Sequence, residues 1–333
     1  MPDGLPTRTL RTASTLRSAD ALVAAGLIAP ADVAATRAVA ARYAIALTPT
    51  VAGLIQSPED PIARQYLPHP DELVTAPDEL DDPTADAPFT PVKGVVHRYP
   101  DRALLKPLLA CPVYCRFCFR REVVGPDGGL LSEAEIDTAI AWFARTPAVR
   151  EVILTGGDPL MLSPRRLADL VGRLAAIPHI DILRIHSRVP VADPGRITAA
   201  LVQALDLDKP LYLCVHANHA REFTDAARTG LRALHRVGVV LLGQTVLLAG
   251  VNDSEAALED LFRAMLAARI KPYYLHRLDL APGTARFRVS AERGRALLHA
   301  LRGRVTGLAW PTFVEETPGG GGKRPIGPGL PAA

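Results

Sequence analysis

Residues that bind metals or anchor carbonyl cofactors are scarce in this sequence, which has four cysteines and five lysines among 333 residues. No run of about 18 apolar residues occurs, so we expect no membrane-spanning helix. The amino terminus lacks the charged-then-apolar pattern of a signal peptide, which predicts a cytoplasmic protein. The net charge is only +3 and no block of basic residues occurs, so neither a nucleic acid nor a membrane is expected as a partner.

Three of the four cysteines stand close together at a CxxxCxxC spacing: Cys111, Cys115 and Cys118. Three thiolates are one short of the four that hold an ordinary 4Fe–4S cluster, so such a cluster would keep one iron open to a small molecule. A zinc ribbon would need a second, distant pair of cysteines. Other zinc sites, redox-active thiols, or a disulfide with one spare thiol stay open as alternatives. Cys214 lies among apolar residues, which favours a buried, inert thiol.

From about residue 96 the sequence alternates between strand and helix patterns, with a period of about 30 residues that suits βα units. Six to seven units are expected, fewer than the eight of a full barrel. The polar residues fall at the ends of the predicted strands, which favours a partial TIM barrel of the α/β class over an open doubly wound sheet. We divide the chain into a helix-rich cap and linker (1–95), the barrel (96–316) and a Gly-rich loop and tail (317–333).

The predicted strands of the barrel are buried, apolar segments separated by amphipathic helices. Ser132, with Glu135 three residues later, forms the capping-box pattern that begins a helix. The strands are expected at 149–155, 181–186, 210–216, 239–247, 271–276 and 308–314, and the helices at 132–146, 163–176, 194–205, 222–237, 254–268 and 290–302. Ahead of the barrel, helices are expected at 18–26, 30–45 and 61–66, followed by an acidic, Pro-rich strap.

Polar residues stand at three of the predicted strands, at the end of the first two and within the third, at 239–247. Gly156 and Gly157 allow a ligand to approach the backbone closely, and Asp158 can accept a hydrogen bond from an ammonium or hydroxyl group. His216 and His219 stand in a second motif; a metal site between them is an alternative, although no carboxylate nearby would complete it. The third polar residue is Gln244.

A run of four glycines precedes Lys323 near the carboxyl end of the chain. The run lacks the spacing of a P-loop, and a disordered tail is the plain alternative. A lysine that must bind and release a carbonyl cofactor needs mobility, which glycines would supply. The sequence therefore marks Lys323 as a candidate for covalent binding of pyridoxal phosphate.

The cysteine motif, with an aromatic residue before its third cysteine, resembles that of the radical S-adenosylmethionine enzymes. The stretch from His97 to Arg121 and the PGGGGK run resemble the lysine 2,3-aminomutase family in particular, and the resemblance extends from about residue 97 to 323. It implies a 4Fe–4S cluster on the three cysteines, with S-adenosylmethionine bound to the open iron. It further implies two residue sets: Gly156, Gly157, Asp158, His216 and Gln244 near S-adenosylmethionine, and Lys323, Arg98, Tyr99 and Arg102 around pyridoxal phosphate.

The resemblance also implies a substrate and a reaction. Arg120 matches the residue that pairs with the substrate carboxylate. Asp279 and Glu316 match two acidic residues that hold the distant amino group of lysine, although the family has Asp in place of Glu316. Two carboxylates in one pocket favour a cationic substrate end. The implied reaction moves the 2-amino group of L-lysine to C3, giving β-lysine, with a flavodoxin or ferredoxin as electron donor.

Several alternatives stay open. The substrate could be the lysine used in modifying elongation factor P, or another cationic amino acid such as arginine. The chain could instead be a radical enzyme, or a cluster-binding protein, without pyridoxal chemistry. Ser254 stands where longer relatives place a zinc cysteine, and the sequence ends ten residues after Lys323, so we expect no structural zinc. A homo-oligomer is possible.

Overall fold

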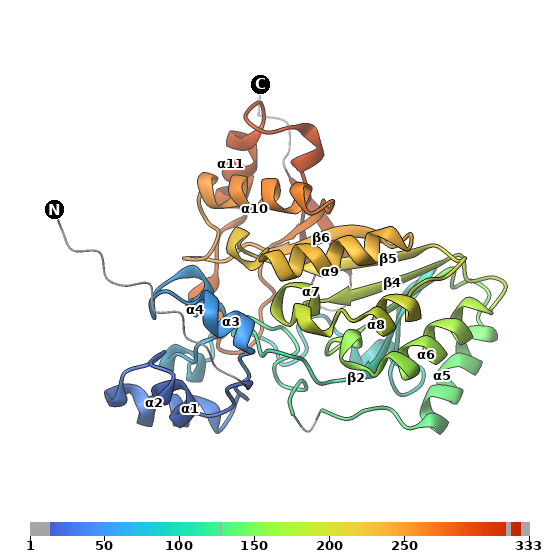
Figure 1. Cartoon of the computed structure of the whole chain (residues 1–333), viewed down its shortest axis with the longest axis horizontal. Helices are drawn as coiled ribbons and strands as arrows, with labels where there is room; N and C mark the ends of the chain where they lie inside the picture. The colour runs from blue at the N-terminus through green and yellow to red at the C-terminus, as the bar shows by residue number, and fades with distance from the viewer. Residues whose placement is uncertain (1–13, 127, 318–320, 328–333) are drawn as a thin grey trace.

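The computed structural model describes residues 14–126, 128–317 and 321–327. The amino-terminal region is a set of short helices, seen at the lower left of Figure 1. Side-chain oxygens of Ser18, Thr48 and Asp60 accept hydrogen bonds from the first turns of three of these helices and so fix where they begin. The helices are α1 (Ala19–Ala24), α2 (Val33–Ala40), α3 (Pro49–Leu54) and α4 (Pro61–Tyr66), with 3-10 turns at Pro30–Asp32, Pro70–Leu73 and Ala87–Phe89.

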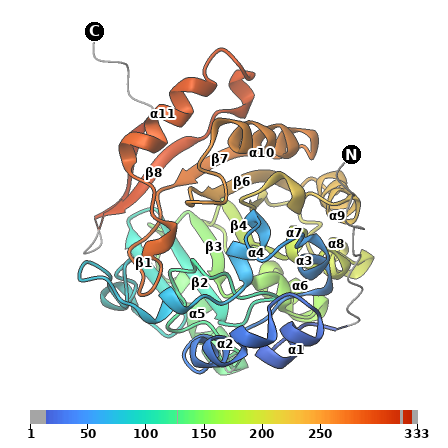
Figure 2. The same ribbon diagram turned by 90° about the vertical axis from the view of Figure 1, so that its left-hand side faces the viewer.

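The barrel is a curled sheet whose nine strands, within the described residues, lie side by side in chain order. The seven strands from β2 to β8 are parallel, and β1 and β9 add antiparallel edges. Figure 2 shows the curl of the sheet, with the amino-terminal helices in front of it. The strands are β1 (Val95–Tyr99), β2 (Arg102–Leu108), β3 (Glu151–Gly156), β4 (Ile182–Ser187), β5 (Leu211–His216), β6 (Val240–Val246), β7 (Lys271–His276), β8 (Thr312–Thr317) and β9 (Gly322–Gly327).

Helices connect successive parallel strands and cover the outer face of the sheet. Over the described residues this gives six βα units closed by β8, which confirms the predicted partial barrel. The capping box of Ser132 and Glu135 is present and begins α5 as predicted. The main connecting helices are α5 (Glu133–Ala144), α6 (Pro164–Ala175), α8 (Ala199–Ala204), α9 (Asp225–Arg236), α10 (Glu255–Ala267) and α11 (Ala291–Leu301).

The structure differs from the sequence predictions at several places. The helix predicted over 194–205 is broken, because a 3-10 turn at Pro194–Arg196 precedes a new start of α8 at the capping residue Thr198. The last predicted strand begins later, at Thr312, after a 3-10 turn at Gly307–Ala309. Helix α2 ends at Ala40, well short of residue 45. The edge strands β1 and β9 were not predicted, and β9 occupies part of the expected Gly-rich loop.

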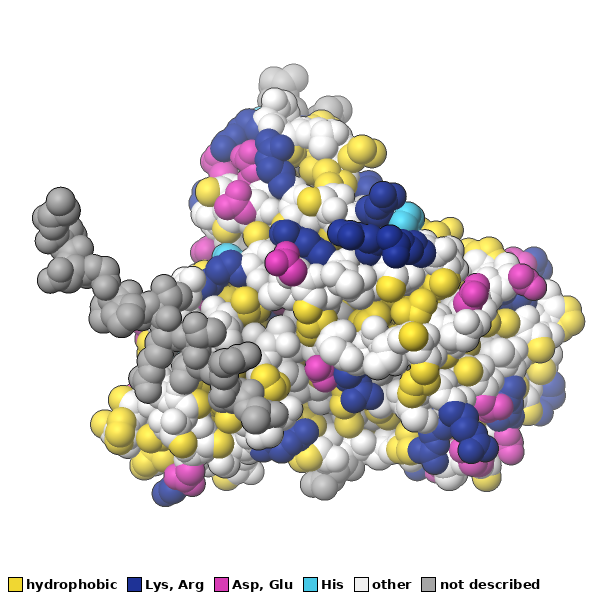
Figure 3. All heavy atoms as spheres, in the orientation of Figure 1, with side chains coloured by type: hydrophobic (Ala, Val, Ile, Leu, Met, Phe, Trp, Pro, Cys, Tyr) yellow, Lys and Arg dark blue, Asp and Glu magenta, His cyan; other side chains and the backbone are white. Residues whose placement is uncertain are grey.

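One large apolar core lies between the sheet and its helices, and a second lies in the amino-terminal region. The second core includes Val113 of the cysteine loop and Ala192, so the cap packs directly on the barrel. Helix α9 shows how the outer face divides: Leu231 and Leu234 are buried, whereas basic side chains gather on its exposed side (Figure 3). None of the helices in the described ranges is both long and apolar enough to span a membrane.

Candidate active site

The carboxyl ends of β2 to β8 meet at one rim of the sheet, which we call the barrel mouth. The cysteine loop and several of the predicted polar residues lie at or just after the carboxyl ends of these strands, so the parallel register brings them to the same edge. The cysteine loop follows β2, Gly156–Asp158 ends β3, Ser187 and Arg188 follow β4, His216 ends β5, Gln244 lies near the end of β6, Asp279 follows β7 and Glu316 ends β8.

The cysteine loop carries three half-buried free thiols. Burial raises the pKa of Cys115 to about 11, and burial also raises the pKa of Cys111, to which the charges of Cys115 and Cys118 add. Within the described residues no three His, Cys, Asp or Glu side chains are grouped to hold one single ion. The donor set fits a polynuclear cluster, in which each thiolate binds a different iron.

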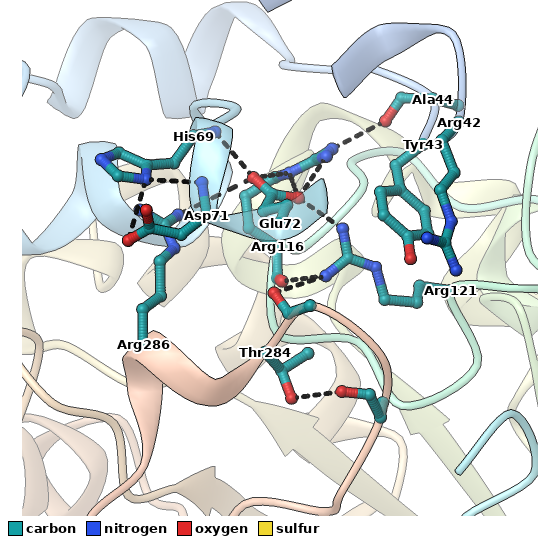
Figure 4. A network of polar contacts seen from close by, with 12 residues as sticks. Arg42, Tyr43, Ala44, His69, Asp71, Glu72, Arg116, Arg121, Thr284 and Arg286 are labelled. Carbon is teal, nitrogen blue, oxygen red and sulfur yellow. Dashed lines mark hydrogen bonds and ion pairs between the residues drawn. The ribbon is translucent and has the colours of Figure 1, made fainter. Parts of the chain in front are cut away.

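A buried network of charges fixes the shape of the cysteine loop (Figure 4). Glu72, from the 3-10 turn before the strap, is fully buried and accepts hydrogen bonds from Arg116 Nε (2.9 Å) and Nη2 (2.6 Å). Arg121 Nη2 also donates to Glu72, and its Nη1 donates to the carbonyl of Arg116 (3.0 Å). Arg116 Nη1 reaches the carbonyl of Ala44. The cap therefore binds the loop through Arg116 and Arg121, the arginines that flank Cys118 in the sequence.

Gly156 and Gly157, at the end of β3, lie close to the backbone of residues 106–110. The N–H of Gly157 donates to the carbonyl of Leu108 (2.8 Å), and that of Asp158 donates to the carbonyl of Ala110 (2.9 Å). A Cβ on Gly157 would lie 2.3 Å from the Ala110 carbonyl oxygen, so only glycine fits here. The close approach predicted for a ligand is made instead by the start of the cysteine loop.

Asp158 has a different position from the one expected of a ligand-binding side chain. Its Oδ1 accepts from Ser187 Oγ (2.8 Å) and from the N–H of Leu160, and its Oδ2 accepts from the N–H groups of Arg188 (2.7 Å) and Val189. Both oxygens are thus used within the protein. Asp158 therefore joins the ends of β3 and β4, and its role near S-adenosylmethionine stays a prediction.

Unsatisfied buried nitrogens face the cysteine loop. His216 stacks edge-on against Phe117, and its Nε2 is buried without a hydrogen-bond partner among the described residues. Burial and the charge of Arg188 lower the pKa of His216 well below its usual value, so the imidazole is neutral at pH 7. Arg188 Nη1 is likewise buried and unsatisfied. These donors fit an anionic, hydrogen-bonding ligand beside the cysteines.

Two other residues of the His216 motif, Asn218 and His219, form hydrogen bonds within the protein. His219 begins a 3-10 turn, and its Nδ1 accepts from the N–H of Arg221. Asn218 is fully buried, donates to Gln65 of α4 and accepts from the N–H of Val246. The alternative of a metal bound between His216 and His219 therefore has no support in this geometry.

Lys323 lies on β9, directly opposite Glu316 of β8. Its Nζ is 3.0 Å from Glu316 Oε2, and its backbone N–H donates to Tyr99 Oη (2.7 Å). Gly322 has φ +82°, and a Cβ there would lie 2.6 Å from Tyr99 Oη, so a glycine is required beside the lysine. Residues 318–320 and 328–333 of the expected Gly-rich loop and tail lie outside the described residues.

A cavity of about 590 Å³ is lined by residues of β1 to β7 together with Lys323, and several of them, such as Glu151 and Ile182, stand at the amino ends of their strands. The cavity is large enough for a small-molecule cofactor. Lys323, Tyr99, Arg102, Gln244 and His186 are among its lining residues. His186 Nε2 is buried without a hydrogen-bond partner in the described part of the chain, as expected where a polar ligand is to bind. The cavity thus fits pyridoxal phosphate beside Lys323.

The three residues expected around the cofactor phosphate divide into two groups. Tyr99 and Arg102 line the cavity, and the Arg102 guanidinium lies 3.8 Å from the centroid of the Tyr99 ring. Arg98 instead turns toward β8, where its Nη2 lies 2.5 Å from Glu316 Oε1, and its Nη1 donates to the carbonyl of Thr84.

An acidic pair lies next to Lys323. Burial raises the pKa of Asp279 to about 6, although Lys323 and Arg120 pull it down, and the charge of Glu316 adds to the rise. Asp279 and Glu316 line one pocket of about 280 Å³. The pKa of His276 falls to about 3 because of burial and the charge of Lys323.

Three residues of this site come from the amino-terminal region, for which the sequence predicts only a helix-rich cap and linker. They are Glu72, Tyr66, whose hydroxyl accepts from Arg188 Nε (2.5 Å), and Asp86, which binds Arg120. Nothing in the local pattern distinguishes Asp86 from its acidic neighbours in the strap. Their partners lie 34 to 122 residues away in sequence, so only folding reveals these contacts.

Comparison with known proteins agrees with this geometry. The model of the Radical SAM superfamily matches residues 105–262. An L-lysine 2,3-aminomutase of Acetoanaerobium sticklandii is 40% identical over 85% of this chain and 69% of its own length. An L-lysine 2,3-aminomutase of Escherichia coli is 41% identical over 81% of this chain and 79% of its own. A glutamate 2,3-aminomutase of Clostridioides difficile is 34% identical over 85% of this chain and 67% of its own length. Because relatives with different substrates are similar to this chain, sequence similarity alone does not identify the substrate, which has to be argued from the pocket.

Proposed function

The chain belongs to the lysine 2,3-aminomutase family within the radical SAM superfamily, and from this premise we propose that it converts L-lysine to β-lysine. The enzyme is an aminomutase, an isomerase that exchanges an amino group and a hydrogen between neighbouring carbons. In the proposed reaction the 2-amino group moves to C3 and one hydrogen moves from C3 to C2, so that no atom is gained or lost.

The observation that carries the choice of lysine is the contact between Lys323 Nζ and Glu316 at 3.0 Å, next to Asp279. A primary ammonium on an alkyl chain already contacts one of the two carboxylates, that of Glu316. The ε-ammonium of lysine is the same chemical group, so the pocket suits it in charge and in hydrogen bonding. A γ-carboxylate of glutamate would meet two like charges there and would be repelled.

We assign the cofactors from the family and from the fit of the residues. The three cysteines would hold the 4Fe–4S cluster, His216 and Gln244 would contact S-adenosylmethionine, and Lys323 would bind pyridoxal phosphate. When bound, these groups supply the radical that removes hydrogen from C3 and the conjugated ring that carries the migrating nitrogen. A flavodoxin or ferredoxin is the proposed electron donor.

The protein's own part is to bind, to orient and to exclude water. Arg120 would hold the substrate carboxylate, while Asp279 and Glu316 would hold its distal ammonium, so both ends of the substrate are fixed and C3 is held in one place. The neutral imidazoles of His186 and His276 line the same region without adding positive charge. The cap contacts the mouth through Tyr66 and Glu72, and its proposed role there is to limit access of water to a reactive radical.

The test is anaerobic reconstitution with iron, sulfide, S-adenosylmethionine and pyridoxal phosphate, followed by separation of α- and β-amino acids. Lysine, ornithine, arginine and glutamate are compared as substrates. We expect β-lysine as the main product, and a preference for glutamate, or no 2,3-shift on any of the four, would refute the proposal. Lys323→Ala should lose the visible absorbance of protein-bound pyridoxal, whereas Lys93→Ala, at an exposed lysine paired with Glu135, should keep it.

A further inference from the structure

The strap between the cap and the barrel places a carboxylate on the arginine assigned to the substrate. Asp86 Oδ2 lies 3.1 Å from Arg120 Nη2 and 3.3 Å from Arg120 Nε. The same oxygen accepts from Lys106 Nζ at 3.1 Å. All three side chains are largely buried, with exposed fractions of 12–18%. A buried group of one carboxylate and two cations thus stands at the barrel mouth.

The contact uses one edge of the Arg120 guanidinium only. Nε and Nη2 form the edge that meets Asp86, and Nη1 points to Thr155 Oγ1, 3.5 Å away near the end of β3. A guanidinium has a second edge, formed by Nη1 and Nη2, that can bind another carboxylate in a bidentate manner. Asp86 therefore fixes the plane of Arg120 through the Nε–Nη2 edge, and the second edge adds only the long contact of Nη1 with Thr155 among the described residues.

The charge of the group also suits one further anion. Lys106 and Arg120 bring two positive charges and Asp86 brings one negative charge, so the group carries a single net positive charge. Burial alone would raise the pKa of Asp86, but Arg120 and Lys106 outweigh it and lower the pKa to about 2. Asp86 is therefore ionised at every pH at which the enzyme would work, and one substrate carboxylate would neutralise the group.

The strap itself is held firmly, so Asp86 is not a freely moving side chain. Asp82 accepts hydrogen bonds from the N–H groups of Asp86 and Ala87, each at 2.9 Å. Farther back, Glu79 accepts from the N–H of Gly283 at 2.8 Å and ties the strap to the loop that follows β7. The carbonyl of Thr84 accepts a hydrogen bond from Arg98 Nη1. The backbone around Asp86 is thus fixed to the barrel at several points.

We propose that Asp86, together with Lys106, is a positioning residue that holds Arg120 in the orientation that binds the α-carboxylate of the substrate. This inference rests on the proposed function and names the part of the pocket that recognises the amino-acid end rather than the distal ammonium. Asp86 acts through Arg120 and does not itself touch the substrate. The alternative is that Asp86 occupies the substrate position and must be displaced, which would make it an obstacle to binding.

The two possibilities predict opposite effects of Asp86→Asn. We expect the variant to bind lysine about tenfold more weakly, the size of effect expected when a charge-assisted contact is lost. The measurement is calorimetric binding of lysine and of 1,5-diaminopentane, which is lysine without its carboxylate, to the pyridoxal-loaded protein. Only lysine binding should weaken, KM for lysine should rise with kcat nearly unchanged, and Asp86→Glu should recover part of the loss. Asp81→Asn, at an exposed position of the same strap, is the matched control.

Three outcomes would overturn the inference. Unchanged or tighter lysine binding by Asp86→Asn would show that the carboxylate is irrelevant or competes with substrate. Equal weakening for lysine and 1,5-diaminopentane would show a general structural defect. Failure of Asp86→Glu to restore any binding would exclude a role for the negative charge. Failure of the proposed function would be recognised by a different result, because the wild-type protein itself would then neither bind lysine nor form β-lysine.

Discussion

Lys323 and Glu316 face each other across the β8–β9 hairpin, with Nζ 3.0 Å from Oε2. The contact joins the residue proposed to hold the cofactor to one of the two residues proposed to hold the substrate ammonium. Glu316 also lies against Arg98, so its carboxylate is shared between two cations. An incoming ammonium group would therefore exchange with a contact that already exists rather than enter an empty acidic pocket.

Glu316→Gln should weaken binding of cationic substrates, because it removes the negative charge from the ammonium pocket. The loss of a hydrogen bond to a charged group costs about 1.5–3 kcal/mol, so KM for lysine should rise by roughly 10- to 100-fold. Steady-state kinetics with lysine would measure the change. Glu315→Gln is the control, since the neighbouring carboxylate pairs with Arg277 and Arg324 instead. Equal effects of both variants would remove Glu316 from the pocket.

Asp279→Asn should stabilise the fold at high pH. The folded-state pKa of about 6 lies above the usual value of 3.8, so the wild type loses stability as the pH rises from about 4 to above 6, when the buried carboxylate ionises. The variant avoids this cost, which we put at about 1–2 kcal/mol after solvent screening. Thermal unfolding at pH 8 and pH 4 would measure it: the variant should unfold at a higher temperature at pH 8, and the difference should vanish at pH 4.

Protonation of Asp279 also has a functional consequence. Below about pH 6 the ammonium pocket loses one of its two negative charges, so KM for lysine should rise as the pH falls through this value. The pH profile of kcat/KM for lysine would report it. In Asp279→Asn this step in the profile should disappear, and a profile that keeps it would assign the titration to another group.

Cys115→Ser should abolish iron binding and turnover without affecting pyridoxal binding, because the cysteine loop and Lys323 lie on different strands. Iron and sulfide analysis after anaerobic reconstitution, together with the absorbance of bound pyridoxal, would separate the two cofactors. Cys214→Ala is the matched control, since Cys214 is buried within β5. A serine variant with full iron content and activity would refute the cluster assignment.

Glu72→Gln should destabilise the protein strongly. The change would leave Arg116 and Arg121 buried without their counter-charge, and breaking a buried ion pair in this way costs about 3–5 kcal/mol. Chemical denaturation would measure the loss of unfolding free energy. Asp71→Asn, one residue away at an exposed position, should change stability little. If the two variants were equally stable, the buried network would not be what holds the cap on the cysteine loop.

Local patterns in the sequence were enough for the barrel and for the family. Alternating apolar segments and N-cap residues such as Ser132 depend on neighbours within a few residues, so six of the seven parallel strands, all but β2, and most helix starts could be predicted. The spacing of Cys111, Cys115 and Cys118 is likewise local. Parallel topology then implied that residues at successive strand ends would meet, since all such ends lie at one rim.

The partners of those residues were decided only by the tertiary structure. Asp86 and Glu72 stand in an acidic, Pro-rich stretch without periodicity, and their partners are 34 and 44 residues away. Asp158 is a plausible ligand-binding residue by motif, yet four hydrogen bonds within the fold already use its oxygens. Similarly, β9 forms by antiparallel pairing with β8, in which Lys323 lies opposite Glu316, and a run of glycines does not predict this pairing.

The amino-acid sequence by itself thus determined which chemical groups the protein carries and along which strands they stand, because these follow from short-range periodicity and spacing. The tertiary structure decided which charge neutralises which. Ion pairs in a buried site depend on distances of a few ångströms between segments far apart in the chain, and electrostatic energy in such a site changes steeply over those distances. That dependence is why the strap that carries Asp86 belongs with the active site rather than with the packing of the cap.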